Sequence, residues 1–78
     1  MSFGLFDNDY NQRLLDRTFY ACRTVLGEGS LSDPEAITAV SRCSHLPSES
    51  VRKYMEKLSF SGVIFHRDGR FAMYKSLA

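Results

Sequence analysis

Residues 40–64 read V-S-R-C-S-H-L-P-S-E-S-V-R-K-Y-M-E-K-L-S-F-S-G-V-I, and this stretch decides the fold. An amphipathic segment breaks at Ser44-His45, and Leu46 is placed to fill the break with an apolar side chain. A second amphipathic segment opens at Ser48 and stops at Gly62, directly before a β-branched pair. This order predicts a helix, a tight turn, a second helix and then a strand.

The second helix of this pair, expected over residues 48–61, separates an apolar face from a charged one. At 100° per residue, the core face consists of Val51, Tyr54, Met55 and Leu58. The opposite face carries Glu49, Lys53, Glu56 and Phe60, with Arg52 and Lys57 on its flanks. We therefore expect the charged side to be available to a partner.

The helix before the turn is expected over residues 33–44, and Ser30 and Leu31 ahead of it could add a very short extended segment. Either Ser32 or Asp33 can act as its N-cap, and Pro34 stands in the first turn. Its buried stripe is expected to consist of Ala36, Ile37, Val40 and Cys43.

A further helix is expected at residues 9–27, where Asp9 and Gln12 have the spacing of a capping box. Its apolar positions recur at helical spacing and are followed by a glycine C-cap: Leu15, Phe19, Cys22, Leu26 and Gly27. Residues 1–8 form an N-terminal arm before it, and this arm contains Phe3, Leu5 and Phe6 without a clear period.

A β-hairpin is expected at residues 63–75, because alternating apolar residues flank Asp68-Gly69, a strong signature of a two-residue turn. Such a turn pairs Arg67 with Arg70, His66 with Phe71, and Ile64 with Met73. Ile64, Phe71 and Met73 are then expected to face inward, while Val63, Phe65, Ala72 and Tyr74 face the other side.

The composition is that of one soluble globular domain over residues 1–78, with 44% hydrophobic and 24% charged residues. The net charge is only +1, but it is unevenly distributed. Six acidic and four basic side chains occur in residues 1–44, whereas six basic and three acidic ones occur in residues 45–78. A basic half can attract phosphate without a high overall charge.

Cys22 and Cys43 are the two cysteines, and both fall on helix faces expected to be apolar. With His45 and His66 they match no zinc-ligand spacing, so we expect no metal or other cofactor. No apolar run is long enough to cross a membrane, and the first residues lack the basic start of a signal peptide. A reduced, cytoplasmic protein is therefore expected.

Taken in chain order, the residues of the expected helices, turn and hairpin resemble those of the winged helix-turn-helix family of transcription regulators. The resemblance rests on Val40-Ser41, Leu46-Pro47-Ser48, Ser50-Val51, Leu58, Gly62-Val63-Ile64 and Asp68-Gly69. It implies a mainly α fold of three helices with a two-stranded wing. It also implies sequence-specific binding of double-stranded DNA, with the helix at residues 48–61 in the major groove and the wing on the adjacent minor groove. His45 stands where such turns often carry glycine, so a left-handed backbone there would be strained.

The residues expected to contact DNA lie on the recognition helix and the wing: Ser48, Ser50, Arg52, Lys53, Lys57, Arg67 and Arg70. The simpler interpretation is a solvated surface whose charges maintain solubility. A second function class is a protein-interaction module without DNA binding, in which Phe60, Phe65 and Tyr74 form the contact surface. No serine has a histidine and an acid in a recognisable catalytic arrangement, so we do not expect an enzyme.

A homodimer is expected as well, formed through the first helix and the N-terminal arm. The apolar face of that helix is broader than a single core contact requires, and the arm has no evident place in a minimal winged helix. The alternative is an arm that folds back and completes the core of its own chain.

Overall fold

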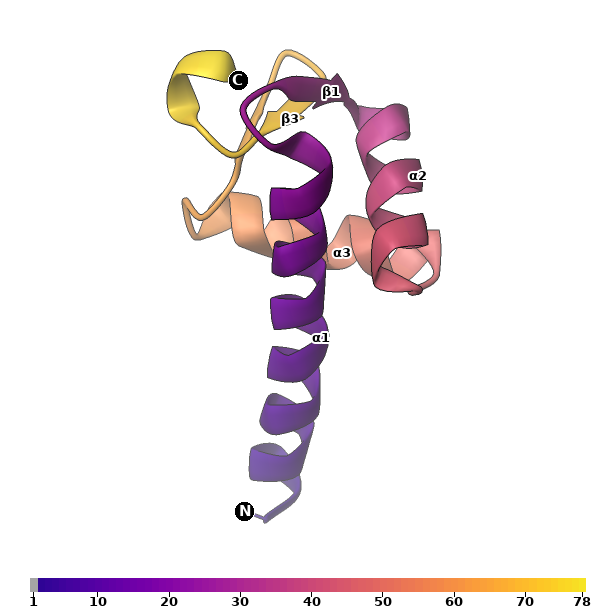
Figure 1. The fold of residues 1–78 in the computed structure, drawn as a ribbon. Coiled ribbons are helices and arrows are strands. Elements are labelled where there is room, and N and C mark those ends of the chain that lie inside the picture. The colour runs from indigo at the N-terminus through magenta and orange to yellow at the C-terminus, as the bar shows by residue number, and fades with distance from the viewer. Residues whose placement is uncertain (1) are drawn as a thin grey trace.

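The computed structural model describes the backbone of residues 2–78 and the side chains of residues 12–78. Within that range the fold is mainly helical, with a small antiparallel sheet at one end (Figure 1). In chain order the elements are α1 (Ser2–Leu26), β1 (Ser30–Ser32), α2 (Asp33–Ser44), α3 (Ser48–Phe60), β2 (Phe65–Arg67), β3 (Arg70–Ala72) and the 3₁₀ turn η1 (Lys75–Leu77).

The sheet has three strands in the described residues, in the order β1-β3-β2, so the expectation of a two-stranded wing is wrong. β1 pairs with β3 through Leu31 and Phe71. β1 is only three residues long, too short to show the alternating hydrophobic pattern of a strand. It becomes a strand by pairing with the hairpin. Ala72, on the central strand β3, is fully buried, although we expected it to face outward.

The hairpin has the predicted register over the pairs that the sheet contains. Arg67 is opposite Arg70, and His66 is opposite Phe71. Asp68 and Gly69 both have positive φ, at 52° and 72°, which is the geometry of a type I′ turn. The turn therefore matches the right-handed twist of the two strands that it joins.

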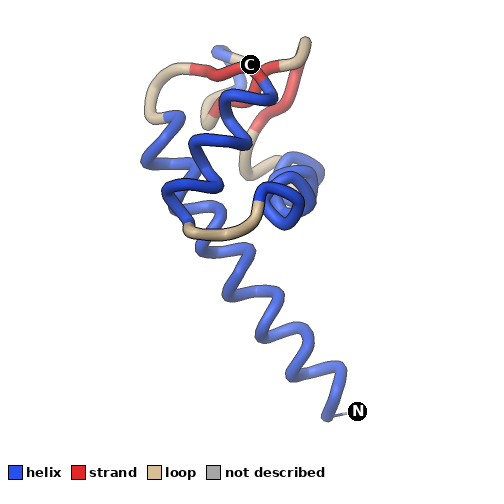
Figure 2. The backbone as a smooth tube through the Cα atoms, turned by 90° about the vertical axis from the view of Figure 1, so that its right-hand side faces the viewer, coloured by secondary structure: helices blue, strands red, loops and turns tan. Residues whose placement is uncertain are grey.

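Helix α1 begins at Ser2, not at Asp9, so the capping-box start is wrong and the backbone of the expected arm is helical from Ser2 onward. Residues 2–8 contain no proline that would stop a helix from extending through them. Two views at right angles show the first turns of α1 extending away from α2, α3 and the sheet (Figures 1 and 2). The side chains of Phe3, Leu5 and Phe6, on which the expected arm depends, lie outside those described.

One core is formed where the three helices meet the sheet. Its buried members are Ala21, Cys22, Leu26, Ala36, Val40, Val51, Met55, Leu58, Ile64 and Phe71. In α2, however, Cys43 is exposed and Ser44 is buried instead. Ser44 follows Ala36 and Val40 at intervals of four residues, and its hydroxyl donates to the Val40 carbonyl at 2.7 Å. That bond satisfies the hydroxyl, which removes most of the cost of burying it.

The turn between α2 and α3 is held by Ser41. The backbone N–H groups of His45 and Leu46 both donate to the Ser41 carbonyl. In return, the Ser41 hydroxyl donates to the Leu46 carbonyl at 2.6 Å. His45 has φ 59° and ψ 34°, so the residue where glycine is usual does adopt the left-handed conformation. This turn fixes the direction in which α3 leaves α2.

Candidate nucleic-acid interface

The core-facing side of α3 is the predicted one, with Val51, Tyr54, Met55 and Leu58 all buried. Its outer side therefore carries the exposed cations Arg52, Lys53 and Lys57. None of the three has a hydrogen bond or ion pair with a described residue. Glu49 and Glu56 are exposed on the same side of α3.

A hollow of about 390 Å³ lies between this side of α3 and strand β2. Lys53, Lys57 and Phe60 line it from α3, and His66 lines it from β2. The structure thus brings two of the predicted site residues together with a histidine that sequence reasoning did not place in the site. The pairing of His66 with Phe71 was visible in the sequence, but the approach of β2 to α3 was not.

His66 is held in position from two sides. Its ring stacks on Phe71, with the ring centroids 4.1 Å apart and an interplanar angle of 9°. Its Nε2 atom lies 2.8 Å from one carboxylate oxygen of Asp33 and 2.9 Å from the other. The Asp33 backbone N–H donates to the Gly69 carbonyl at the hairpin tip, at 2.9 Å. Asp33, at the start of α2, therefore links the hairpin to the helix that precedes the turn.

The two hairpin arginines differ in how firmly hydrogen bonds hold their side chains. Arg70 donates from Nε to the Ser30 hydroxyl and from a terminal nitrogen to the Ser30 carbonyl, both at 3.0 Å. Its guanidinium therefore helps to hold β1 against β3. Arg67 is 74% exposed, and its Nε lies 3.7 Å from a carboxylate oxygen of Asp68. Of the two, Arg67 is the one whose charge is more available to a partner.

Ser48 and Ser50 lie in the first turn of α3, Ser48 exposed and Ser50 partly buried. The N-cap is Pro47, and no described side chain caps the helix. The uncapped N–H groups of this turn are aligned with the positive end of the helix dipole, which favours an anionic group.

The aromatic residues of the alternative contact surface are not gathered in one place. Phe60 is 98% exposed and lines the hollow next to α3. Tyr74 is 56% exposed and lines a different hollow, together with Arg23 and Gly27 at the end of α1. Phe65 is only partly exposed. Phe60 is thus the aromatic side chain that adjoins the cations of α3.

The described residues contain no group of three or more histidine, cysteine, aspartate or glutamate side chains that could hold a metal ion. Burial, and secondarily the neighbouring Cys43, raise the pKa of the Cys22 thiol from 9.0 to about 12. A thiol with that pKa is almost entirely protonated at neutral pH and is a poor nucleophile.

None of the helices, over the residues that are described, is both long and apolar enough to span a membrane. No protein-family model matches the chain, and comparisons with curated proteins and with solved structures give no significant match.

Proposed function

We propose that the chain is a small winged helix-turn-helix protein that binds double-stranded DNA as a transcription regulator. Helix α3 would enter the major groove, and the β2–β3 hairpin would lie on the adjacent minor groove. The element order α1-β1-α2-α3-β2-β3, with a tight turn between α2 and α3, supports this arrangement. The seven residues expected to contact DNA remain the proposed site.

The observation that carries the proposal is the set of cations on the exposed side of α3 that make no ion pair with a described residue: Arg52, Lys53 and Lys57. A helix is about 10–12 Å wide with its side chains, and the major groove of B-DNA is about 12 Å wide. Lys53 is the candidate for a base contact. Ser48 and the free N–H groups of the first turn are suited to the phosphate backbone.

Fluorescence anisotropy on random duplex DNA at several salt concentrations tests the proposal. Each phosphate neutralised contributes about −0.9 to the slope of log K against log salt, so three contacts give roughly −2.7. Between about 50 and 200 mM salt, the affinity should then fall roughly 40-fold. No binding at the lower salt would contradict the proposal.

The matched variants are Lys53→Ala with Lys57→Ala, compared with Lys75→Ala. All three lysines are exposed, but Lys75 lies in η1 and lines no part of the α3 hollow. The α3 variant should weaken binding and reduce the magnitude of the salt slope by about 0.9, the contribution of a phosphate contact by Lys57, whereas Lys75→Ala should leave both unchanged. Equal effects of the two would indicate attraction by overall charge, without a site on α3.

For the hairpin, Arg67→Ala tests DNA binding more directly than Arg70→Ala. Arg70→Ala would also remove the two hydrogen bonds to Ser30 and so weaken the pairing of β1 with β3. Arg67→Ala should lower the affinity about equally for all sequences, since a wing arginine contacts mainly phosphate or groove shape.

The second candidate function is a protein-interaction module, and the 98% exposure of Phe60 favours it. An exposed aromatic beside an apolar hollow is a common anchor in protein interfaces. Phe60→Ser should abolish partner binding if this function is correct, and binding through an apolar contact should depend little on salt. Under the DNA hypothesis, Phe60→Ser should leave the salt titration unchanged.

A further inference from the structure

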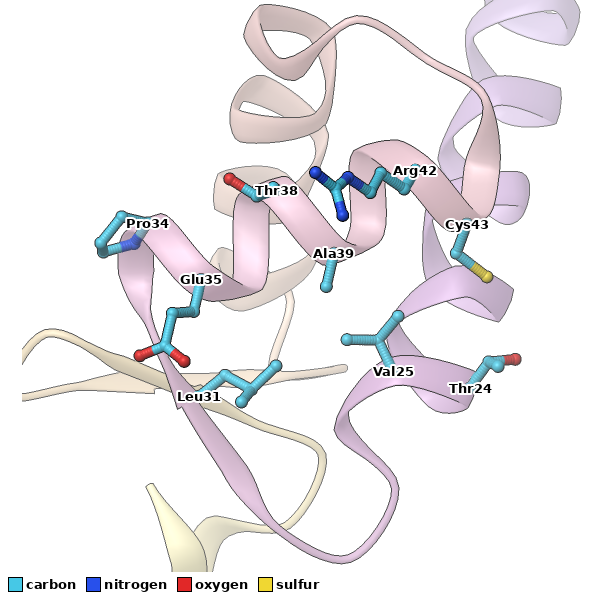
Figure 3. Close-up of a pocket in the computed structure, with 9 residues that line it drawn as sticks. All are labelled: Thr24, Val25, Leu31, Pro34, Glu35, Thr38, Ala39, Arg42 and Cys43. Atoms are coloured by element: carbon cyan, nitrogen blue, oxygen red, sulfur yellow. The ribbon is translucent and has the colours of Figure 1, made fainter.

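A larger hollow, of about 850 Å³, lies on the outer side of α2. Val25 from the end of α1 and Leu31 from β1 form its floor, and α2 forms one wall (Figure 3). Glu35 and Ala39 point from α2 toward these two apolar residues (Figure 3). Neither Lys53 nor Lys57 lines this hollow, so it is separate from the proposed DNA site.

The residues of α2 along this hollow follow a symmetric pattern. Glu35 and Arg42 are both exposed and lie seven residues apart, which is close to two helical turns or about 10.5 Å along the same stripe. Thr38 and Ala39, both small, lie between them. The acid and the base are therefore equally far from the midpoint of the 38–39 pair.

The charges of Glu35 and Arg42 are not neutralised by an ion pair with any described residue. Arg42 has no hydrogen bond or ion pair with any described residue. Glu35 accepts a hydrogen bond from the Ser32 hydroxyl at 2.7 Å through one carboxylate oxygen, Oε1. Its other carboxylate oxygen makes no hydrogen bond with a described residue. Each copy thus offers one cation and one carboxylate oxygen at fixed spacing.

From this pattern we infer that a second copy of the chain docks on the outer side of α2, with the two α2 helices antiparallel across a two-fold axis. With the axis between Thr38 and Ala39, Glu35 of each copy faces Arg42 of the other. A two-fold interface must be self-complementary in this way. Small residues at the crossing allow the helices to approach at the 8–10 Å typical of packed pairs. The apolar floor of each hollow is then covered by the opposite copy.

This occupant is favoured over an unrelated peptide because the acid and the base lie equally far from the midpoint of residues 38 and 39, so an antiparallel second copy places opposite charges face to face. The contact is limited to one helix of 12 residues and its hollow. It therefore belongs to the small interfaces, for which weak association is the rule. The inference does not depend on DNA binding.

Charge reversal tests it by analytical ultracentrifugation at about 200 µM, a concentration chosen for a weak dimer. Wild type should be dimeric. Glu35→Arg and Arg42→Glu should each weaken the dimer at least tenfold, because each creates two like-charge pairs across the axis. Mixing the two single variants should produce a heterodimer, since each of the two pairs across the axis then joins an arginine to a glutamate. Position 35 of the Glu35→Arg copy faces position 42 of the Arg42→Glu copy, and the unchanged Arg42 of the first faces the unchanged Glu35 of the second. The double variant Glu35→Arg with Arg42→Glu should self-associate about as well as wild type.

The matched control is Arg23→Glu, which reverses an exposed charge on α1 outside this hollow and should leave the dimer intact. Circular dichroism on each variant checks that it is folded, and recovery of pairing on mixing excludes misfolding as the cause of the loss. A monomeric wild type at this concentration would overturn the inference. So would a dimer that survives both single reversals, which would point instead to the pairing through α1 expected from the sequence.

Discussion

Replacing His45 by glycine should stabilise the fold, because the turn between α2 and α3 forces this residue into the left-handed region at φ 59°. That conformation costs an L-residue about 1–2 kcal/mol. Glycine removes this cost but gains freedom in the unfolded chain, which offsets about 0.4–1 kcal/mol. The exposed His45 ring makes no hydrogen bond or ion pair with a described residue, so few contacts are lost. The net gain is therefore about 0.5–1 kcal/mol.

For a domain of this size, the gain corresponds to a rise in melting temperature of roughly 2–8 °C, measurable by thermal denaturation followed by circular dichroism. Gly62→Ala is the reciprocal control. Gly62 has φ 79°, and a Cβ built there meets no atom within 4 Å, so its cost comes from the backbone alone. Gly62→Ala should destabilise by about 1 kcal/mol. If His45→Gly lowers the melting temperature while His45→Val is tolerated, the left-handed turn is not populated in solution.

Three further predictions concern the core, the cysteines and the turn. Leu58→Ala should cost about 2–5 kcal/mol in urea denaturation, because Leu58 is 5% exposed in the core; an unchanged midpoint would mean that α3 packs in another register. At pH 8, iodoacetamide should modify Cys43 and spare Cys22, because a pKa raised to about 12 leaves roughly one Cys22 thiol in ten thousand ionised. Mass spectrometry should then find one label on the native protein and two in denaturant, and two labels on native protein would contradict the burial of Cys22. Ser41→Ala should cost about 1 kcal/mol by loss of the 2.6 Å bond to the Leu46 carbonyl, and a melting curve like that of wild type would show that the bond does not stabilise the turn.

The parts of the fold that the sequence predicted are those determined locally. Helices α2 and α3 begin at the predicted residues, Asp33 and Ser48, and the core face of α3 consists of the four residues expected. The Asp68-Gly69 turn sets the hairpin register, because a two-residue loop leaves only one way to pair the flanking residues. Where periodicity and turn chemistry agreed, the prediction was correct.

The missed features depend on contacts between distant segments. Ser30 and Leu31 indicated a very short extended segment, but its place as a third strand depends on its pairing with β3, some forty residues further along the chain. The choice between Cys43 and Ser44 for the buried stripe of α2 depends on how that helix is rotated against α1, and hydrophobicity alone favoured the cysteine. In the candidate site, the anchoring of His66 by Asp33 also joins distant segments. None of these contacts produces a repeating hydrophobic pattern from which it could be predicted.

On the exposed face of α3, the effect of a substitution on DNA binding can be measured separately from its effect on stability. Its cations contribute nothing to the described hydrogen-bond network, so replacing Lys53 or Lys57 should change binding without changing stability. Arg70 is different, because its two bonds to Ser30 make it part of the sheet as well as of the proposed wing. A loss of DNA affinity in an Arg70 variant would therefore mix two causes, whereas a loss in a Lys53 variant has one. The cations of α3 that the proposed function needs take no part in the contacts among the described residues, so replacing them tests binding alone.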